Sequence, residues 1–336
     1  MRHSIFLFAI GLAGCGGNAS VDREIPRERP RLGSSDDATM PVEESIEAIS
    51  FLGDTLSEFP LTDQVRTQRE QQFEEARQRW VADPGNLDNI IWAGRRAAYL
   101  GRYQEAILIF GLGLKQYPDD PRLYRHRGHR YITTRQLDSA VVDLERAAEL
   151  IEGQPDRVEP DGLPNVQNIP LSTLHSNIWY HLGLARYLQG DYQRAADTYR
   201  RGVAGSTNRD MEVAARYWLY LTLLRLDRTD EAKAVVDVVE PDWPLIENTT
   251  YLRLLLLYRG TVSVDSLLPA TTTGTVGSAT LGYGVAQWYL AQGMRDDARR
   301  TLDGVLASGQ WPAFGYVAAE ADVAREGGKA VGRLRR

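Results

Sequence analysis

The sequence predicts an all-α fold, a superhelical solenoid of about six helix-turn-helix units followed by a C-terminal capping helix. Three observations support this prediction. Small residues recur at a fixed period of 34 residues, which separates Gly94 from Gly128 and Ala106 from Ala140. Large apolar residues recur at the same spacing between them. The apolar fraction of 43% and the charged fraction of 25% are typical of a folded globular protein.

Each unit is expected to be a pair of helices. Glycine or alanine at the recurring positions lets the two backbones approach closely, and large side chains such as Phe110 and Tyr199 fill the space that remains. One such hairpin cannot bury its apolar faces alone, so consecutive hairpins have to stack. The sequence therefore predicts contacts between neighbouring units along the whole array.

The third copy, "IWYHLGLARYLQGDYQRAADTYRRGV", carries these recurring residues as Trp179, Leu182, Gly183, Ala195 and Tyr199. This pattern resembles the tetratricopeptide repeat (TPR), although Arg186 stands where that family has a tyrosine. The phrases "YRHRGHRYI", "EPDGLPN" and "STLHSNIWYHLGLARYL" are also similar to an uncharacterised group of bacterial tetratricopeptide proteins over most of residues 85–325. That second resemblance implies no known activity.

The predicted solenoid spans residues 43–326. Its first part, 42–59, is expected to be an amphipathic helix that pairs with a helix in "TQREQQFEEARQRWVADPGN". The loop 153–173, "GQPDRVEPDGLPNVQNIPLST", interrupts the period and contains four prolines, which favour a turn-rich conformation. The Thr/Gly-rich segment 269–280 is expected to be a flexible connector. Residues 327–336 are expected to form a disordered tail.

The N-terminal segment carries a targeting signal. Its apolar run, residues 5–12, is too short to cross a bilayer as a permanent helix. The following "LAGC" resembles the lipobox of bacterial lipoproteins, which implies a signal peptide at 1–14 and a lipid on Cys15. A flexible tether at 15–42 would then link the membrane to the solenoid. The alternative is an ordinary secretory signal with an incidental cysteine.

The lipobox resemblance also implies a location. A lipid-anchored protein of this kind belongs to the bacterial cell envelope, with the periplasmic face of the outer membrane favoured if the cell is Gram-negative. Cys15 is the only cysteine of the chain, so no intramolecular disulfide can form.

The stretch "YRHRGHRY" (124–131) suggests a binding surface. In tetratricopeptide arrays one stripe of each first helix lines a concave groove. By that resemblance, the partner-binding groove residues are Arg95, Arg122, Arg125, His126, His129, Asn177, Tyr180, His181 and Tyr187. The alternative is that they are solvated polar residues of amphipathic helices.

The expected partner is a protein or peptide. The chain has a formal net charge of −6, so a locally basic groove would select an acidic segment or a carboxylate terminus. No basic face dominates the chain, so a nucleic-acid partner is not expected.

No catalytic residue, metal or cofactor is expected. The sequence lacks G-x-S-x-G, H-E-x-x-H and Walker A motifs. His126 and His129 are three residues apart on one predicted helix, but His181 belongs to the next unit, and packed helices are about 8–10 Å apart. A metal-dependent enzyme, for example a hydrolase, built on these histidines is the least favoured alternative.

A glycan-binding lipoprotein is the other alternative. It would use aromatic residues of the central units, namely Trp92, Trp179, Tyr180, Tyr187, Tyr217 and Trp218. Aromatic residues at repeat spacing are more often core residues than ligand contacts. The favoured hypothesis is therefore a membrane-anchored scaffold or adaptor that binds a protein or peptide in the concave groove of its array.

Overall fold

The computed structural model describes residues 45–272 and 275–334. The predicted signal peptide, Cys15 and the tether lie outside these residues. From Glu44 onward the chain forms one compact unit. In the described part of the chain, no helix combines the length and the apolar character that crossing a bilayer requires.

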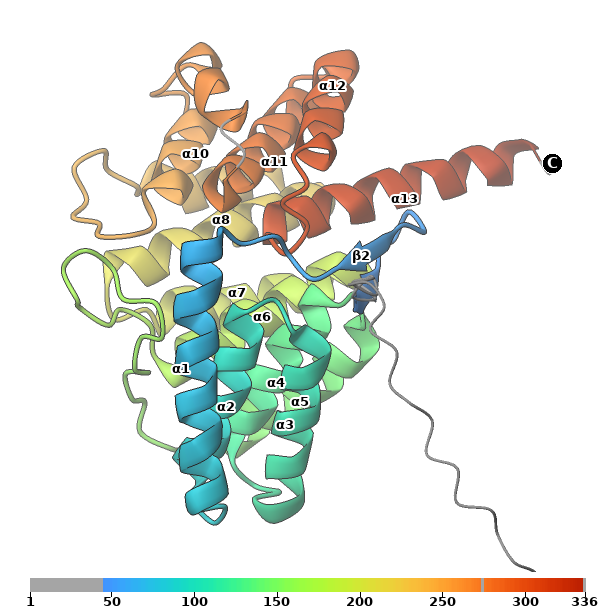
Figure 1. The fold of residues 1–336 in the computed structure, drawn as a ribbon. Helices are drawn as coiled ribbons and strands as arrows, with labels where there is room; N and C mark the ends of the chain where they lie inside the picture. The colour runs from blue at the N-terminus through green and yellow to red at the C-terminus, as the bar shows by residue number, and fades with distance from the viewer. Residues whose placement is uncertain (1–44, 273–274, 335–336) are drawn as a thin grey trace, which may run out of the picture. The chain divides into compact units, whose positions relative to one another are not determined.

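Helical hairpins build this unit, as Figure 1 shows. The α-helices are α1 (Asp63–Ala82), α2 (Leu87–Tyr99), α3 (Tyr103–Gln116), α4 (Pro121–Thr133), α5 (Leu137–Leu150), α6 (Leu174–Gln189), α7 (Tyr192–Ala204), α8 (Arg209–Arg225), α9 (Thr229–Asp237), α10 (Thr249–Arg259), α11 (Val276–Ala291), α12 (Arg295–Ala307) and α13 (Phe314–Leu334). Consecutive helices pack against each other, and each hairpin packs against the next in chain order. The predicted all-α solenoid is confirmed.

The close approach of paired helices depends on glycine. A Cβ added to Gly94 would lie 2.4 Å from the ring of Phe110, and one added to Gly183 would lie 2.6 Å from the ring of Tyr199. Both distances are far below van der Waals contact, so a side chain at either position would force the helices apart. Both pairs are 16 residues apart in the chain, one at the same place in each hairpin.

The first described segment is a β-hairpin instead of the predicted helix. Strand β1 (Ile46–Ile49) pairs in antiparallel fashion with β2 (Thr55–Ser57). Gly53, in the turn between them, has a φ of +95°, which glycine adopts without strain. The β-branched residues of the two strands favour an extended backbone. Glu47 fixes the hairpin to α3, because its carboxylate accepts a hydrogen bond of 2.9 Å from the backbone N–H of Gln104.

Two segments that were expected to be irregular contain helix. Leu268–Thr272 is a 3-10 helix, as is Val264–Ser266 before it. Within the segment 269–280, α11 begins at Val276 and the hydroxyl of Thr275 caps it by accepting a hydrogen bond from the backbone N–H of Ser278. At the C-terminus α13 continues to Leu334, so most of the expected tail belongs to this helix.

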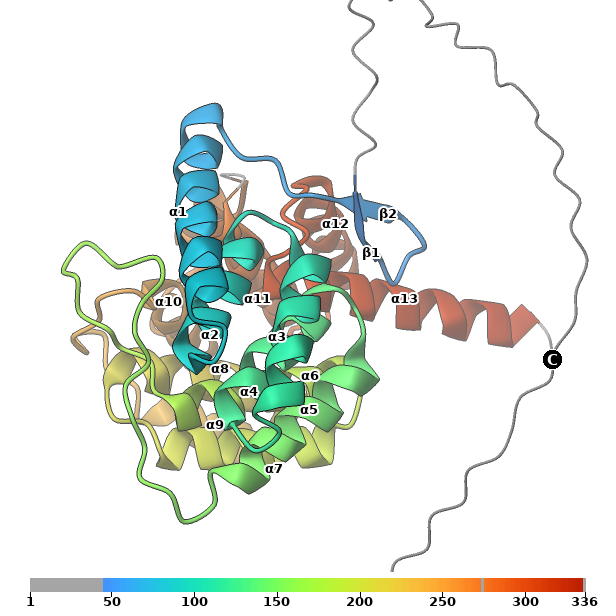
Figure 2. The same cartoon turned by 60° about the horizontal axis from the view of Figure 1, so that its bottom comes forward.

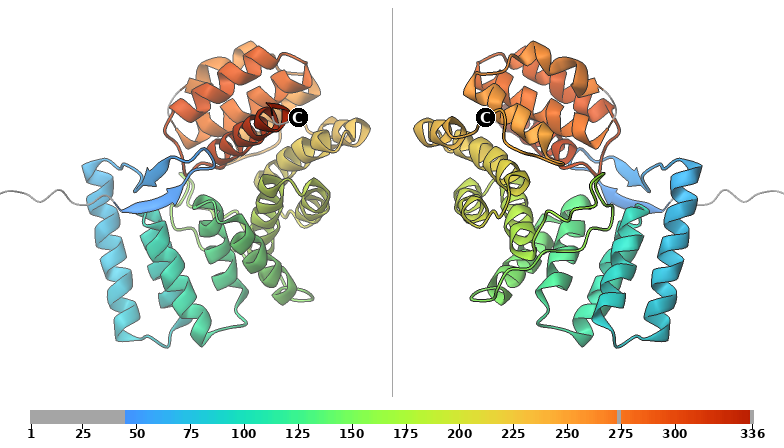
Figure 3. Two further views of the ribbon diagram at one scale, coloured as in Figure 1. Left: turned by 90° about the vertical axis from the view of Figure 1, so that its right-hand side faces the viewer. Right: turned by 90° about the vertical axis from the view of Figure 1, so that its left-hand side faces the viewer.

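The predicted capping helix α13 lies between the hairpin α11–α12 and the earlier hairpins (Figure 3). The β-hairpin is beside it (Figure 2), where the backbone N–H of Phe51 faces the carboxylate of Glu320 at 3.5 Å. Just before α13, the ring of Trp311 packs edge-on against Tyr103 of α3 at 5.4 Å. The C-terminal helix therefore joins the two ends of the array.

Candidate functional site

The first helices of three hairpins bring most of the predicted groove residues together. The Nη1 atom of Arg125 lies 2.7 Å from Nδ1 of His126, both on α4. The rings of His129 on α4 and His181 on α6 are only 4.1 Å apart between centroids. These arginine and histidine side chains form a cluster, which we call the concave cluster. Its members are Arg95, Arg125, His126, His129, Arg130 and His181.

The inserted loop 153–173 covers one part of this cluster. The carboxylate of Glu159 forms an ion pair of 2.7 Å with Arg125 and accepts a hydrogen bond from the amide of Asn177. Arg95 donates to the carbonyl of Pro160 at 2.8 Å. An acidic segment of the chain itself thus occupies the place that the sequence assigned to an acidic partner.

Helix α13 covers the other part of the cluster. The ring of Phe314 lies 5.3 Å from that of His129, 5.7 Å from that of His181 and 6.1 Å from that of Tyr180. The hydroxyl of Tyr180 is bonded to the hydroxyl of Tyr251 at 2.8 Å. A partner could reach these side chains only after α13 moved away.

Two predicted groove residues lie apart from the cluster centre. Tyr187 is fully buried in the core, and its hydroxyl is 2.7 Å from that of Tyr283. Arg122 lies at the edge, where it pairs with Asp88 at 2.7 Å and Asp120 at 2.9 Å. The placement of Tyr187 differs from the prediction because the later hairpins turn back over α6 and enclose it.

Burial determines which side chains of the concave cluster carry a charge at neutral pH. It lowers the pKa of His126, His129 and His181 well below the usual histidine value, and the neighbouring arginines lower it further. Burial also lowers the pKa of Arg130 to about 10, which leaves its guanidinium charged at neutral pH. The cluster therefore combines neutral imidazoles with permanent cations.

The geometry bears on the two alternatives, a metal site and a glycan-binding surface. Among the described residues, no group of three or more histidine, cysteine, aspartate or glutamate side chains is arranged to hold a metal ion. Of the aromatic residues considered for glycans, Tyr187, Tyr217 and Trp218 are fully buried in the core. The guanidinium of Arg95 covers the ring of Trp92 at 4.4 Å.

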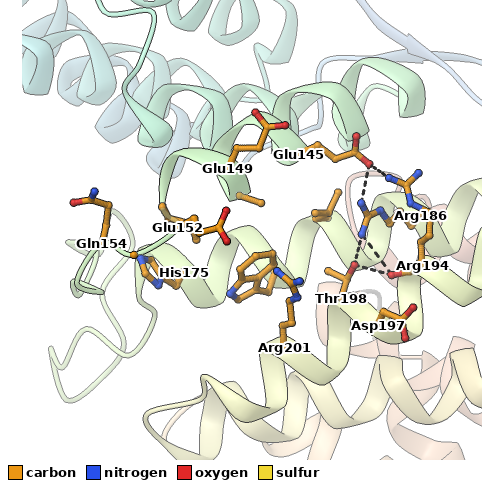
Figure 4. A pocket seen from close by; sticks show the side chains of 15 residues that line it. Glu145, Glu149, Glu152, Gln154, His175, Arg186, Arg194, Asp197, Thr198 and Arg201 are labelled. Carbon is orange, nitrogen blue, oxygen red and sulfur yellow. Dashed lines mark hydrogen bonds and ion pairs between the residues drawn. The ribbon is translucent and has the colours of Figure 1, made fainter.

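A different surface is open. Helices α5, α6 and α7 enclose a groove of about 750 Å³, which we call the α5–α7 groove (Figure 4). Its floor is apolar, with Ile151, Trp179 and Leu182. Its ionisable lining residues are Glu145, Glu149, Glu152, His175, Arg186, Arg194, Asp197 and Arg201.

Ion pairs fix one end of this groove and leave the other accessible. Glu145 of α5 pairs with Arg186 of α6 at 2.7 Å and also with Arg194 of α7 (Figure 4). At the other end the guanidinium of Arg201 lies 5.3 Å over the ring of Trp179. Glu152 is exposed there and has no ion pair among the described residues.

Sequence reasoning missed this groove. Its rim comes from the second helices of two units, whose charged side chains suggested solvated faces. One signal was present, because the break in the 34-residue period falls directly after α5. The loop inserted there begins at Gly153, which lines the groove together with Gln154.

Comparison with known proteins agrees with the repeat geometry. Residues 178–201 match the family model of the tetratricopeptide repeat. The stacked hairpins define the class of helical-repeat proteins. The matched residues lie in the third hairpin, formed by α6 and α7. Over these residues the third hairpin is similar to a tetratricopeptide repeat.

Solved structures with a similar fold have low sequence identity. A tetratricopeptide repeat protein from Parabacteroides merdae is 14% identical, with 76% of this chain and 93% of that chain covered and a TM-score of 0.44. YrrB, described as a TPR protein with an unusual peptide-binding site, is 14% identical, with coverages of 70% and 93% and a TM-score of 0.41. MamA is 18% identical, with coverages of 64% and 93% and a TM-score of 0.35. No curated protein matches the chain.

Proposed function

We propose that this protein is a scaffold or adaptor that binds a segment of a partner protein in the α5–α7 groove, and that a lipid on Cys15 anchors it in the bacterial envelope. One observation supports this site above the concave cluster. The groove is open, whereas the loop 153–173 and α13 cover the cluster.

The lining of the groove defines the partner segment. Ala148 and Trp179 are half-buried and offer an apolar contact surface. A segment with one apolar anchor residue would cover them and remove apolar area from water. At the same end the exposed carboxylates of Glu149 and Glu152 favour a basic residue beside that anchor. The acidic partner predicted for the concave face would instead have to displace Glu159.

The lipid anchor rests on the sequence alone and limits where the partner can be. The tether expected from the sequence over residues 15–42 would have an average reach of about 30 Å, estimated from the square root of its length. The partner segment is then expected at or near the same membrane surface. Cys15→Ser should move the protein from the membrane fraction to the soluble fraction.

Charge reversal tests the groove. In native cells, Glu149→Arg and Glu152→Arg should each reduce the amount of co-purifying partner by about tenfold, which corresponds to about 1.4 kcal/mol, because each replaces a carboxylate that would attract the basic residue of the partner. Both side chains are exposed, so the helical content should not change. Quantitative mass spectrometry of crosslinked, affinity-purified protein measures the recovery.

Arg300→Glu on α12 is the matched control, because Arg300 is exposed and lies outside the groove. It should recover as much partner as the wild type. If both groove variants also recover wild-type amounts, the groove is not the binding site.

A further inference from the structure

A cavity of about 210 Å³ lies beneath the loop 153–173, and the scaffold function does not use it. Helices α2 and α4 contribute three arginines to its wall, Arg95, Arg125 and Arg130. The loop contributes Asp161. The volume is below the range of about 300–1,000 Å³ that drug-sized ligands occupy, so only a small molecule fits.

Two of the arginines have unused hydrogen-bonding capacity. Arg125 is 9% exposed, and its Nε atom is buried without a hydrogen-bond partner from the protein. Arg130 makes no ion pair among the described residues, and its guanidinium lies 5.5 Å over the ring of Tyr103. Arg95, in contrast, is satisfied by the hydroxyl of Tyr99 at 3.1 Å and by the carbonyl of Pro160.

Positive charge is in excess around this cavity. His126 and His129 also line it, and their lowered pKa values make them neutral. Glu159 is committed to Arg125. This leaves Asp161 as the one carboxylate in the wall. Burying cations without enough anions is costly, and an anion that enters the cavity would offset that cost.

Asp161 places a second requirement on any ligand of this cavity. Its Oδ2 atom is buried and has no hydrogen-bond partner from the protein. A ligand that carried only an oxyanion would leave this acceptor unsatisfied. A ligand that also carried a hydrogen-bond donor would satisfy both sides of the cavity.

We propose that this cavity binds a small carboxylate with a hydroxyl or ammonium group on the adjacent carbon, and that the loop 153–173 closes over it. Arg125 and Arg130 hold the carboxylate, and Asp161 accepts the hydrogen bond from the neighbouring group. This site is separate from the α5–α7 groove, so either can exist without the other.

Calorimetric titration of the full chain in detergent tests the ligand class. Glycolate and glycine should bind saturably and at least about tenfold more tightly than acetate, which lacks the donor group. Inorganic phosphate should bind no more tightly than acetate. If glycolate and glycine give no binding up to about 10 mM, or if phosphate binds best, the proposal is overturned.

Variants then distinguish a binding role from a structural one. Arg130→Met removes an unpaired, half-buried cation, so it should leave the melting temperature unchanged or raise it while glycolate affinity falls at least about tenfold. Asp161→Asn should reduce the preference for glycolate over acetate. Arg300→Met, on the exposed face of α12, should change neither property. A lower melting temperature for Arg130→Met, or unchanged glycolate affinity, would show that Arg130 is structural.

Discussion

Three histidines show how single residues respond to the interior that they share. His126, His129 and His181 meet in the concave cluster, and burial beside Arg125 and Arg130 lowers the pKa of each. In the unfolded chain each histidine takes up a proton near pH 6.5. The folded state resists that proton, so protonation favours unfolding.

We therefore expect the free energy of unfolding to fall as the pH drops below about 6.5. The loss can reach about 1.4 kcal/mol per pH unit for each histidine until the pH approaches the lowered pKa of the folded state. Urea unfolding followed by circular dichroism at pH 7.5 and pH 5.5 measures it. His129→Gln should reduce the difference between the two pH values, and equal stability of the wild type at both would contradict the expectation.

The packing glycines could be predicted residue by residue, whereas the burial of Tyr187 could not. Gly94 and Gly183 occupy the same position in their repeat units, and the structure shows large rings against both. Tyr187 lies on the predicted stripe, but its environment is set by Tyr283 of α11, 96 residues further along the chain. Local spacing carries no information about such a distant contact.

Among the single elements of the fold, the inserted loop 153–173 is the one whose contacts could not be foreseen. Its ends are held together by hydrogen bonds from the backbone N–H of Glu159 to the carbonyl of Ser172 and from that of Leu174 to the carbonyl of Arg157. In its middle Val166 is 99% exposed. The loop is attached to the array by the ion pair between Glu159 and Arg125 and by hydrogen bonds from Arg95 and Arg96 to its backbone carbonyls.

Glu159→Gln should destabilise the protein and release the loop. Both partners of this ion pair are more than nine-tenths buried, and removing one charge from such a pair costs about 3–5 kcal/mol. Limited trypsin digestion should then cleave faster after the exposed Arg157. Glu152→Gln, at an exposed and unpaired position nearby, is the control and should change stability by less than about 0.5 kcal/mol. Equal cleavage of the two variants would show that Glu159 does not hold the loop.

Helices and the position of the loop could be predicted from the 34-residue period, but the role of the loop could not. The sequence showed four prolines and a break in periodicity, which indicate a loop and not its contacts. The β-hairpin at Ile46–Ser57 was missed because so short an apolar segment suits a helix and a strand equally well.

On the scale of the whole molecule, one ion pair joins the second hairpin to the last helix. Arg135 donates to both carboxylate oxygens of Glu320, at 2.8 and 2.9 Å, and to the carbonyl of Trp311 at 2.9 Å. Arg135 has a φ of +64°, whereas the corresponding turns of two other hairpins use Gly101 and Gly190. An L-residue in this conformation costs about 1–2 kcal/mol, so the chain accepts strain to place this side chain.

Arg135→Gly should destabilise the fold although it relieves that strain. The side chain of Glu320 is only 1% exposed, and an unpaired buried carboxylate costs about 3–5 kcal/mol, more than the strain returns. Urea unfolding measures the net loss. Asp227→Gly is the matched control, because Asp227 has a φ of +56° in an equivalent turn but is exposed, so glycine should be neutral or stabilising there. If Arg135→Gly is also neutral, α13 does not depend on this contact.

The position of Glu320 near the end of the chain has a consequence for biosynthesis. The ribosome completes the first hairpins long before residue 320 emerges, so Arg135 lacks its counterion until 185 further residues have been made. During that interval the early hairpins can collapse without reaching their final arrangement.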